Sequence, residues 1–196
     1  MHKEFRQIIQ FILVTWILSA CANKAPIEQF PDITFSHLNA FKINTAKIVV
    51  ENQFHQPIKT PHIEHTLRMP PRTAIESWLK ERFQPFGSSG ILSLIIQDAT
   101  VTREPLAIDK SLKGRLTKQQ SVIYKMIARA RLQIKDKNGK IMATASASVE
   151  RSLTAREDLS LNDRDRLLLE MVSDLMSDFN NSIEPNIYSH FKPWLK

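Results

Sequence analysis

Cysteine is almost absent from this chain of 196 residues, because Cys21 is the only one. No disulfide can form within the chain, so any core has to be stabilised by packing alone. Glycine is also scarce, with four residues, and no low-complexity run occurs. These two absences argue against sequence repeats and extended disorder. We find no nucleophile elbow, no Cys–His pair and no clustered pair of acids, so a hydrolase or metal enzyme has no motif in its favour.

A long apolar run is missing as well, although a short one lies near the N-terminus. Residues 8–18 are mostly apolar, with Gln10 and Thr15 as interruptions, and Lys3 and Arg6 precede or border the run. A membrane-spanning helix needs about 18 to 20 apolar residues, and this run is shorter. A basic start followed by a short apolar run predicts a secretory signal peptide over residues 1–20. A retained membrane helix is the alternative.

The run ends in Leu18-Ser19-Ala20-Cys21. This tetrapeptide resembles the lipobox of bacterial lipoproteins. The resemblance implies that a peptidase cleaves between Ala20 and Cys21 and that Cys21 carries acyl chains such as palmitate. Stable anchoring takes more than one such chain, because each buried methylene contributes about 0.8 kcal/mol. By the enterobacterial sorting rule, Ala22 implies delivery to the outer membrane, with the chain on its periplasmic face.

The chain that follows residue 20 is basic. It keeps 25 basic and 19 acidic residues, a net charge of +6. Such a charge in an exported protein suits anionic lipid headgroups, lipopolysaccharide phosphates or acidic proteins better than nucleic acid. A basic periplasmic protein without such a partner is the alternative. The length predicts one domain, and we place a lipidated tether at residues 21–44 and the domain at residues 45–196.

Two polar features invite a chemical interpretation. His62, Glu64 and His65 form a short cluster, but an extended chain places His62 and Glu64 on one face and His65 on the other. Zinc sites usually need three or four converging ligands, so we expect polar loop residues, no metal and no cofactor. Asp98 lies at a strand end, where we expect a hydrogen-bonded carboxylate rather than a catalytic acid.

The first half of the domain alternates strand and helix patterns. Residues 45–54 and 91–101 predict strands, the second apolar on both faces in its first half. Thr73 and Glu76 have the spacing of a capping box, which predicts a helix over residues 73–84 that buries Trp78 on its apolar stripe. Residues 104–118 predict a loop, basic at Lys110, Lys113, Arg115 and Lys118, which is a second candidate for an anionic contact.

The strongest pattern is a hairpin over residues 120–152. Asn138-Gly139 predicts a two-residue type I′ turn, which pairs residues whose numbers sum to 277. In this register all the residues of one face are apolar. The opposite face is polar, and turn and alternation therefore agree on one register. The paired apolar residues are Ala128, Ala130, Leu132 and Ile134 with Val149, Ala147, Ala145 and Ala143.

The polar face of this hairpin carries a basic stripe of Lys125, Arg129, Arg131 and Lys135. We take it as a candidate surface for an anionic ligand or partner. A solvated sheet face kept soluble by charge is the alternative.

A last helix is predicted over residues 162–182, with an apolar stripe at spacings of three and four, ended or kinked by Pro185. The order is then strand, helix, three strands, helix. This order predicts an α+β fold in which two helices cover one face of a four-stranded, antiparallel-rich sheet.

A lipidated domain of this size and order resembles the auxiliary lipoproteins of ABC-type envelope transport systems. More loosely, it resembles the lipoprotein that plugs the lipopolysaccharide-export barrel. The resemblance covers the lipobox and the element order over residues 45–183 and transfers no functional residue. It implies a non-catalytic transport auxiliary of the cell envelope that serves a lipid or lipopolysaccharide transport complex. A structural assembly factor for an outer-membrane machine and a periplasmic hydrolase or metal enzyme are the alternatives.

Overall fold

The computed structural model describes residues 32–107, 119–156 and 158–196. The predicted signal peptide, Cys21, the rest of the tether up to residue 31 and the basic loop residues Lys110, Lys113, Arg115 and Lys118 lie outside the described residues. Residues 32–196 form one compact unit. Its strands and helices, in chain order, are β1 (Phe41–Ile43), β2 (Lys47–Asn52), α2 (Pro71–Arg82), β3 (Phe83–Pro85), β4 (Ile91–Asp98), β5 (Val101–Pro105), β6 (Val122–Lys135), β7 (Ile141–Ala155) and α4 (Leu161–His190). Short 3-10 turns lie at Glu64–Thr66 and Lys192–Trp194.

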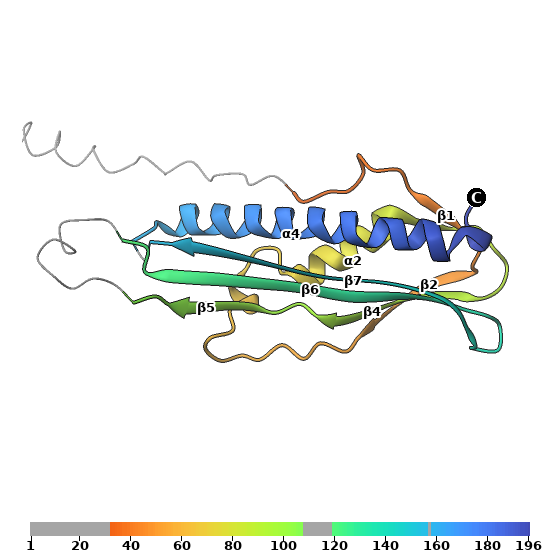
Figure 1. The fold of residues 1–196 in the computed structure, drawn as a ribbon, viewed down its shortest axis with the longest axis horizontal. Helices are drawn as coiled ribbons and strands as arrows, with labels where there is room; N and C mark the ends of the chain where they lie inside the picture. The colour runs from red at the N-terminus through yellow and green to blue at the C-terminus, as the bar shows by residue number, and fades with distance from the viewer. Residues whose placement is uncertain (1–31, 108–118, 157) are drawn as a thin grey trace, which may run out of the picture. The chain divides into compact units, whose positions relative to one another are not determined.

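The main sheet is built around β6 (Figure 1). β7 pairs with one edge of β6 along nearly its whole length, whereas β4 and β5 share the other edge one after the other. β2 lies parallel to β4, and the other pairings are antiparallel. The predicted α+β class is confirmed, in a mixed sheet of five strands. The fifth strand arises because the predicted strand over residues 91–101 continues as β5 after a register shift next to Asp98.

Both long helices cover the same face of this sheet, as predicted (Figure 1). The face is lined by small residues of β6 and β7, all at most 5% exposed: Ala128, Ala130, Ala145 and Ala147. Small side chains let a helix approach the sheet closely, and α4 packs along β7 and β6 there. At 1.5 Å per residue, its 30 residues extend about 45 Å, so α4 runs along the strands rather than across them (Figure 1).

The predicted hairpin register is confirmed, but the predicted turn is wrong. Ala128 lies opposite Val149 and Ile134 opposite Ala143, as the sum of 277 requires. Only Gly139 in this turn has a positive φ, +81°, so Asn138 does not adopt the type I′ conformation. The loop is one residue longer, and Asp136 N–H donates to the Lys140 carbonyl at 2.9 Å. A one-residue shift between Ile134 and Lys135 restores the register.

Three helix boundaries differ from the predictions. α2 begins at Pro71 without a side-chain cap, so the predicted capping box is wrong; proline suits a first helical position because that position needs no N–H donor. α2 ends at Arg82, and Phe83–Pro85 pairs in parallel with β1 as a second, small sheet. α4 continues through Pro185 to His190.

The described part of the predicted tether packs against the domain. Phe35 and Phe41 are 4% and 5% exposed, and β1 belongs to the small sheet. The Glu81 carboxylate accepts hydrogen bonds from the Phe35 N–H at 2.6 Å and from the Thr34 hydroxyl at 2.8 Å. Residues 32–44 are therefore part of the compact unit.

Candidate functional site

The four residues of the predicted basic stripe lie on the outer face of the sheet, opposite the helices. They occupy odd positions of β6, and their even neighbours are buried beneath α2 and α4. Arg129 is exposed, and the other three are half-buried. Arg131 lies between Ile95 of β4 and Ser146 of β7. The structure thus brings Lys125, Arg129, Arg131 and Lys135 onto one surface, which we call the outer face.

The two ends of this stripe are neutralised by acids on neighbouring strands. Lys135 Nζ lies 2.9 Å from Glu51 Oε1, and Lys125 Nζ lies 3.6 Å from Glu104 Oε2. The hydrogen bond from Lys135 is the largest cause of a lowered pKa at Glu51, and burial opposes it. The lysines at the ends of the stripe therefore contribute little net charge to a partner.

The central arginines keep their charge available. Arg129 Nε donates to the Ser148 hydroxyl at 3.1 Å, a neutral partner. Within the described ranges, neither Arg129 nor Arg131 forms an ion pair. The cationic centre of the outer face is therefore the pair Arg129 and Arg131.

Next to this centre, the outer face has a buried part, with one apolar and two polar side chains, that was not predicted from the sequence. Ser93, Ile95 and Gln133 are 2%, 6% and 8% exposed although they lie on this face. The Lys135–Glu51 ion pair joins β6 to β2 across β4. The sequence of β4 indicates this burial, because the strand is apolar on both faces in its first half. The outer face is therefore amphipathic rather than purely polar.

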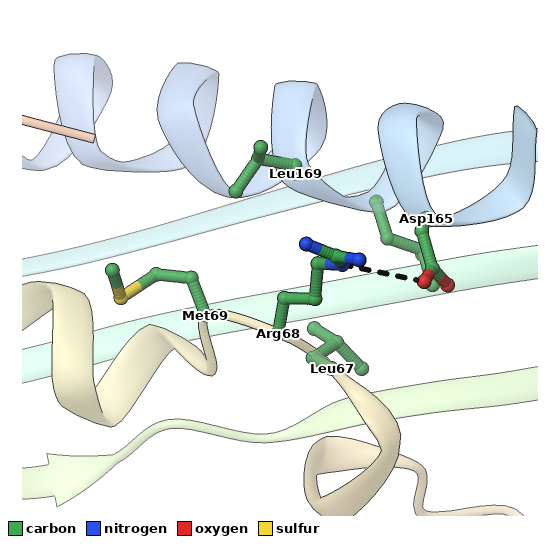
Figure 2. Close-up of a pocket in the computed structure, with 6 residues that line it drawn as sticks. Leu67, Arg68, Met69, Asp165 and Leu169 are labelled. Atoms are coloured by element: carbon green, nitrogen blue, oxygen red, sulfur yellow. Dashed lines mark ion pairs between the residues drawn. The ribbon is translucent and has the colours of Figure 1, made fainter. Parts of the chain in front are cut away.

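A shallow hollow lies between the segment before α2 and the first half of α4 (Figure 2). Its enclosed volume is about 10 Å³, which holds one water molecule at most. An ion pair of 3.6 Å between Arg68 Nε and Asp165 Oδ2 crosses one side of it. The hollow is too small for an organic ligand. It is lined by Leu67, Arg68, Met69, Asp165, Leu168 and Leu169.

The histidine and glutamate cluster forms a structural contact. Glu64 is 1% exposed, and its Oε1 accepts a hydrogen bond from the Val101 N–H at 2.8 Å. His62 Nδ1 lies 3.2 Å from the same oxygen. In the described part of the chain, no three His, Cys, Asp or Glu residues converge as metal ligands. The carboxylate fastens the segment before α2 to β5.

The Asp98 carboxylate likewise forms a structural contact. Its Oδ1 accepts hydrogen bonds from the Thr100 N–H at 3.1 Å and the Thr100 hydroxyl at 2.6 Å. This confirms the predicted hydrogen-bonded residue at a strand end.

A buried polar network joins α2, α4 and the segment before β1. Arg82 is 1% exposed, donates to the Asn39 carbonyl and contacts Glu184 Oε2 at 3.0 Å. Trp78, 0% exposed, donates through Nε1 to Asn180 Oδ1 at 3.0 Å, and Asn180 donates to Glu184. Trp78 is therefore a core residue, as predicted. The two charged side chains, Arg82 and Glu184, both bind partners within the fold, so the network is structural.

No helix in the described ranges combines the length and apolar character needed to cross a membrane. Cys21 and the predicted cleavage site lie outside those ranges, so the lipid-attachment site remains a sequence-based prediction.

Comparison with known proteins gives distant likenesses only. No family model matches the chain, and no curated protein does. Among solved structures, a minor lipoprotein from Acinetobacter baumannii is 16% identical, with a TM-score of 0.40 over 74% of this chain and 94% of that one. A DUF330 protein from Xanthomonas campestris is 8% identical, with a TM-score of 0.38 over 82% and 93%. The rare lipoprotein B from Shewanella oneidensis is 13% identical, with a TM-score of 0.30 over 69% and 92%. Likenesses at this level do not assign a family or a function.

Proposed function

We propose that this protein is a non-catalytic, lipid-anchored component of the bacterial cell envelope that presents its outer face to a partner. The observation that carries the proposal is the sequence Leu18-Ser19-Ala20-Cys21 after a short apolar run. It supports acylation at Cys21, and Ala22 supports the outer membrane as the destination. The partner is an envelope lipid or lipopolysaccharide transport complex, in which this chain is an auxiliary subunit.

The surface chemistry of the domain supports a role in binding rather than in catalysis. Arg129 and Arg131 provide two cations without acidic partners in the described ranges, beside the apolar Ile95 and Ile127. Mixed apolar and cationic surfaces suit acidic proteins and anionic lipids, because arginine binds carboxylates and phosphates in a bidentate geometry. β2, β5 and β7 each pair with a single strand of the main sheet, and an edge strand can also receive a partner strand.

Metabolic labelling with a radioactive fatty acid tests the anchor. We expect the wild-type chain to take up label and the Cys21→Ser variant to take up none. Label in Cys21→Ser at the wild-type level would exclude Cys21 as the acylated residue. Fractionation of the same cells into inner and outer membranes tests the destination that Ala22 supports.

Recovery of partners tests the outer face. We expect Arg129→Glu combined with Arg131→Glu to reduce recovery of co-purifying envelope proteins at least about tenfold, because truncating or reversing a partner of a buried charge pair commonly costs 2–5 kcal/mol. The matched control is Lys59→Glu with Lys80→Glu, which changes the net charge equally at two exposed positions outside the strands of the sheet. Equal recovery from both variants would contradict a role for the outer face.

The identity of the recovered proteins separates the transport role from that of an assembly factor. An inner-membrane ABC system in the purified material supports the transport auxiliary. Recovery of an outer-membrane barrel without any ABC subunit supports the structural assembly factor instead.

A further inference from the structure

One end of the compact unit carries lysines with almost no acids. Four segments that are distant in sequence form this end: residues 39–47, 83–90, 136–142 and 185–196. They contain six lysines and a single acid, Asp136. All six lysines are exposed. We call this surface the lysine end; its cations are Lys42, Lys47, Lys137, Lys140, Lys192 and Lys196.

Backbone hydrogen bonds hold these segments together. Phe86 N–H donates to the Ile43 carbonyl at 3.0 Å, and Asn44 N–H donates to the Trp194 carbonyl at 2.8 Å. Lys196 N–H donates to the Lys42 carbonyl at 3.2 Å. A Cβ atom at Gly90 would lie 2.8 Å from the Lys135 carbonyl oxygen, so the hairpin loop adjoins the same surface. In Figure 1, β1, the end of α4 and the C-terminus lie together at one end of the unit.

The charge of this surface is not neutralised within the fold. No ion pair joins any of the six lysines to another residue in the described ranges. The single acid, Asp136, is engaged in its own loop, where its Oδ1 accepts hydrogen bonds from the N–H groups of Asn138 and Lys140 at 2.8 Å each. The opposite end of α4 differs, because acids and arginines alternate there and pair with each other, as Arg156 does with Asp158 at 2.6 Å. The excess of lysine is therefore specific to one end.

Exposed apolar side chains gather at the same end. Of the seven large hydrophobic residues that are exposed in the described part of the chain, four lie here. Lys196 Nζ lies 6.0 Å from the centre of the Phe86 ring, within the range of a cation–π contact. Aromatic side chains with lysines beside them are the composition of membrane–water interfaces. The four residues are Phe86 (51% exposed), Ile141 (50%), Met142 (47%) and Tyr188 (55%).

We infer that the lysine end is a membrane-docking surface that binds the headgroups of an anionic lipid bilayer. Cations attract the phosphates of such headgroups, and the four exposed apolar side chains fit the boundary between headgroups and acyl chains. The inference rests on the proposed anchoring of the chain at a membrane. Residues 22–31 would extend at most about 35 Å, so an anchored domain stays within reach of the bilayer and a weak contact suffices. Docking through this end leaves the outer face available to a protein partner.

Quenching of tryptophan emission by brominated lipid tests the docking. The full-length chain is reconstituted into vesicles of brominated phosphatidylcholine, with and without an equal part of phosphatidylglycerol. Trp194 is half-buried within the lysine end, whereas Trp78 is fully buried in the core. A Trp194→Phe variant supplies the background from Trp78 and from Trp16, where that residue is still present. We expect quenching of the Trp194 signal to be at least about twofold greater with phosphatidylglycerol, because each lysine near an anionic surface contributes about 1 kcal/mol.

Charge-reversal variants show whether the lysines cause the docking. Lys192→Glu with Lys196→Glu is expected to lower quenching to the level seen in pure phosphatidylcholine, and Lys42→Glu with Lys47→Glu to do the same from another segment. Lys59→Glu with Lys80→Glu, which reverses two exposed lysines outside the four segments of the lysine end, is the matched control and is expected to quench as wild type. Equal quenching in both vesicle types, or wild-type quenching in both lysine variants, would overturn the inference. A chain that fails to associate with either vesicle type contradicts the proposed anchor instead, so the two failures are distinguishable.

Discussion

At the scale of single residues, Arg82 is a buried charged group whose loss has a large expected effect on stability. Its guanidinium is 1% exposed, contacts Glu184 at 3.0 Å and lies 4.6 Å above the Phe41 ring. Removing one partner of a buried ion pair leaves the other group uncompensated and costs about 3–5 kcal/mol. We therefore expect Arg82→Met to lower the free energy of unfolding by about 3 kcal/mol, since Glu184 keeps partial solvent access. Urea denaturation measures the change.

Arg72 in the same helix is the control for Arg82. It pairs with Glu76 one turn away at 3.0 Å, but 48% of its side chain is exposed. Exposed pairs of this kind contribute about 0.3–0.5 kcal/mol. A loss in Arg72→Met as large as that in Arg82→Met would show that burial is not the cause.

The contribution of Glu51 to the stability of the fold depends on pH. The hydrogen bond from Lys135 lowers the pKa of Glu51 below its usual value of 4.5, with burial acting in the opposite direction. A carboxyl group whose pKa is lower in the folded state stabilises the fold above its unfolded pKa. That contribution is lost as the pH falls through the folded pKa.

We expect Glu51→Gln to be less stable than wild type near neutral pH by at most about 1 kcal/mol, because both members of the pair are partly exposed. The difference should shrink towards zero as the pH falls below 4.5 and passes through the lowered pKa of Glu51. Urea denaturation at neutral and acidic pH measures it. A difference that persists unchanged in acid would show that the Glu51 charge is not its cause.

At the scale of elements, substitutions in the hairpin turn distinguish the predicted type I′ turn from the longer loop in the structure. Within this turn Gly139 alone has a positive φ, +81°, and apart from its chain neighbours no atom lies within 4 Å of a Cβ placed there. Gly139→Ala should therefore lower the free energy of unfolding by about 1–2 kcal/mol, through backbone strain without a steric clash. Asn138→Ala is the matched control with an expected change below about 0.5 kcal/mol. Comparable losses in both variants would support the type I′ turn instead.

The same hairpin shows what the sequence determines and what it does not. Alternation over β6 and β7 determines the register, because a slip by one residue would expose Ala128, Ala130 and Leu132. The turn is less constrained, because Asn-Gly also fits a three-residue loop followed by a shift between Ile134 and Lys135. The predicted register was therefore correct although the predicted turn was wrong.

The last helix was predicted to end or kink at Pro185, and the structure shows why it continues. Pro185 removes one hydrogen bond to the carbonyl four residues earlier, that of Asn181. Asn181 is exposed, so water can satisfy this carbonyl. The burial of Ile183 and Ile187 on either side of Pro185, both 0% exposed, holds the helix together. Tertiary packing, which a local pattern does not reveal, overrides the proline.

The candidate site, too, could be predicted only in part from the sequence. Alternation in β6 was enough to place Arg129 and Arg131 on one face. It could not show that Glu51 and Glu104 neutralise the lysines at the two ends, because those acids belong to other strands. The lysine end was also beyond sequence reasoning, since four distant segments form it only after folding.

At the scale of the whole molecule, the outer face and the lysine end are two cationic surfaces with different surroundings. The outer face has two arginines that form no ion pair in the described part of the chain, among polar and apolar strand residues, whereas the lysine end joins six lysines to exposed rings. Arginine favours specific pairing with carboxylates or phosphates, and lysine acts as a flexible point charge towards a charged surface. The two surfaces are therefore expected to bind different partners.

This separation predicts that the effects of the two sets of substitutions are independent. Mutations at distant sites without shared partners add within about 0.5 kcal/mol. Arg129→Glu with Arg131→Glu should reduce partner recovery and leave quenching of Trp194 unchanged, whereas Lys192→Glu with Lys196→Glu should do the reverse. The fourfold variant should show each loss at the size measured in the corresponding double variant, in both assays. If instead either double variant alone abolishes both partner recovery and quenching, a single cationic surface binds one anionic partner, and the division into a docking end and a partner face is wrong.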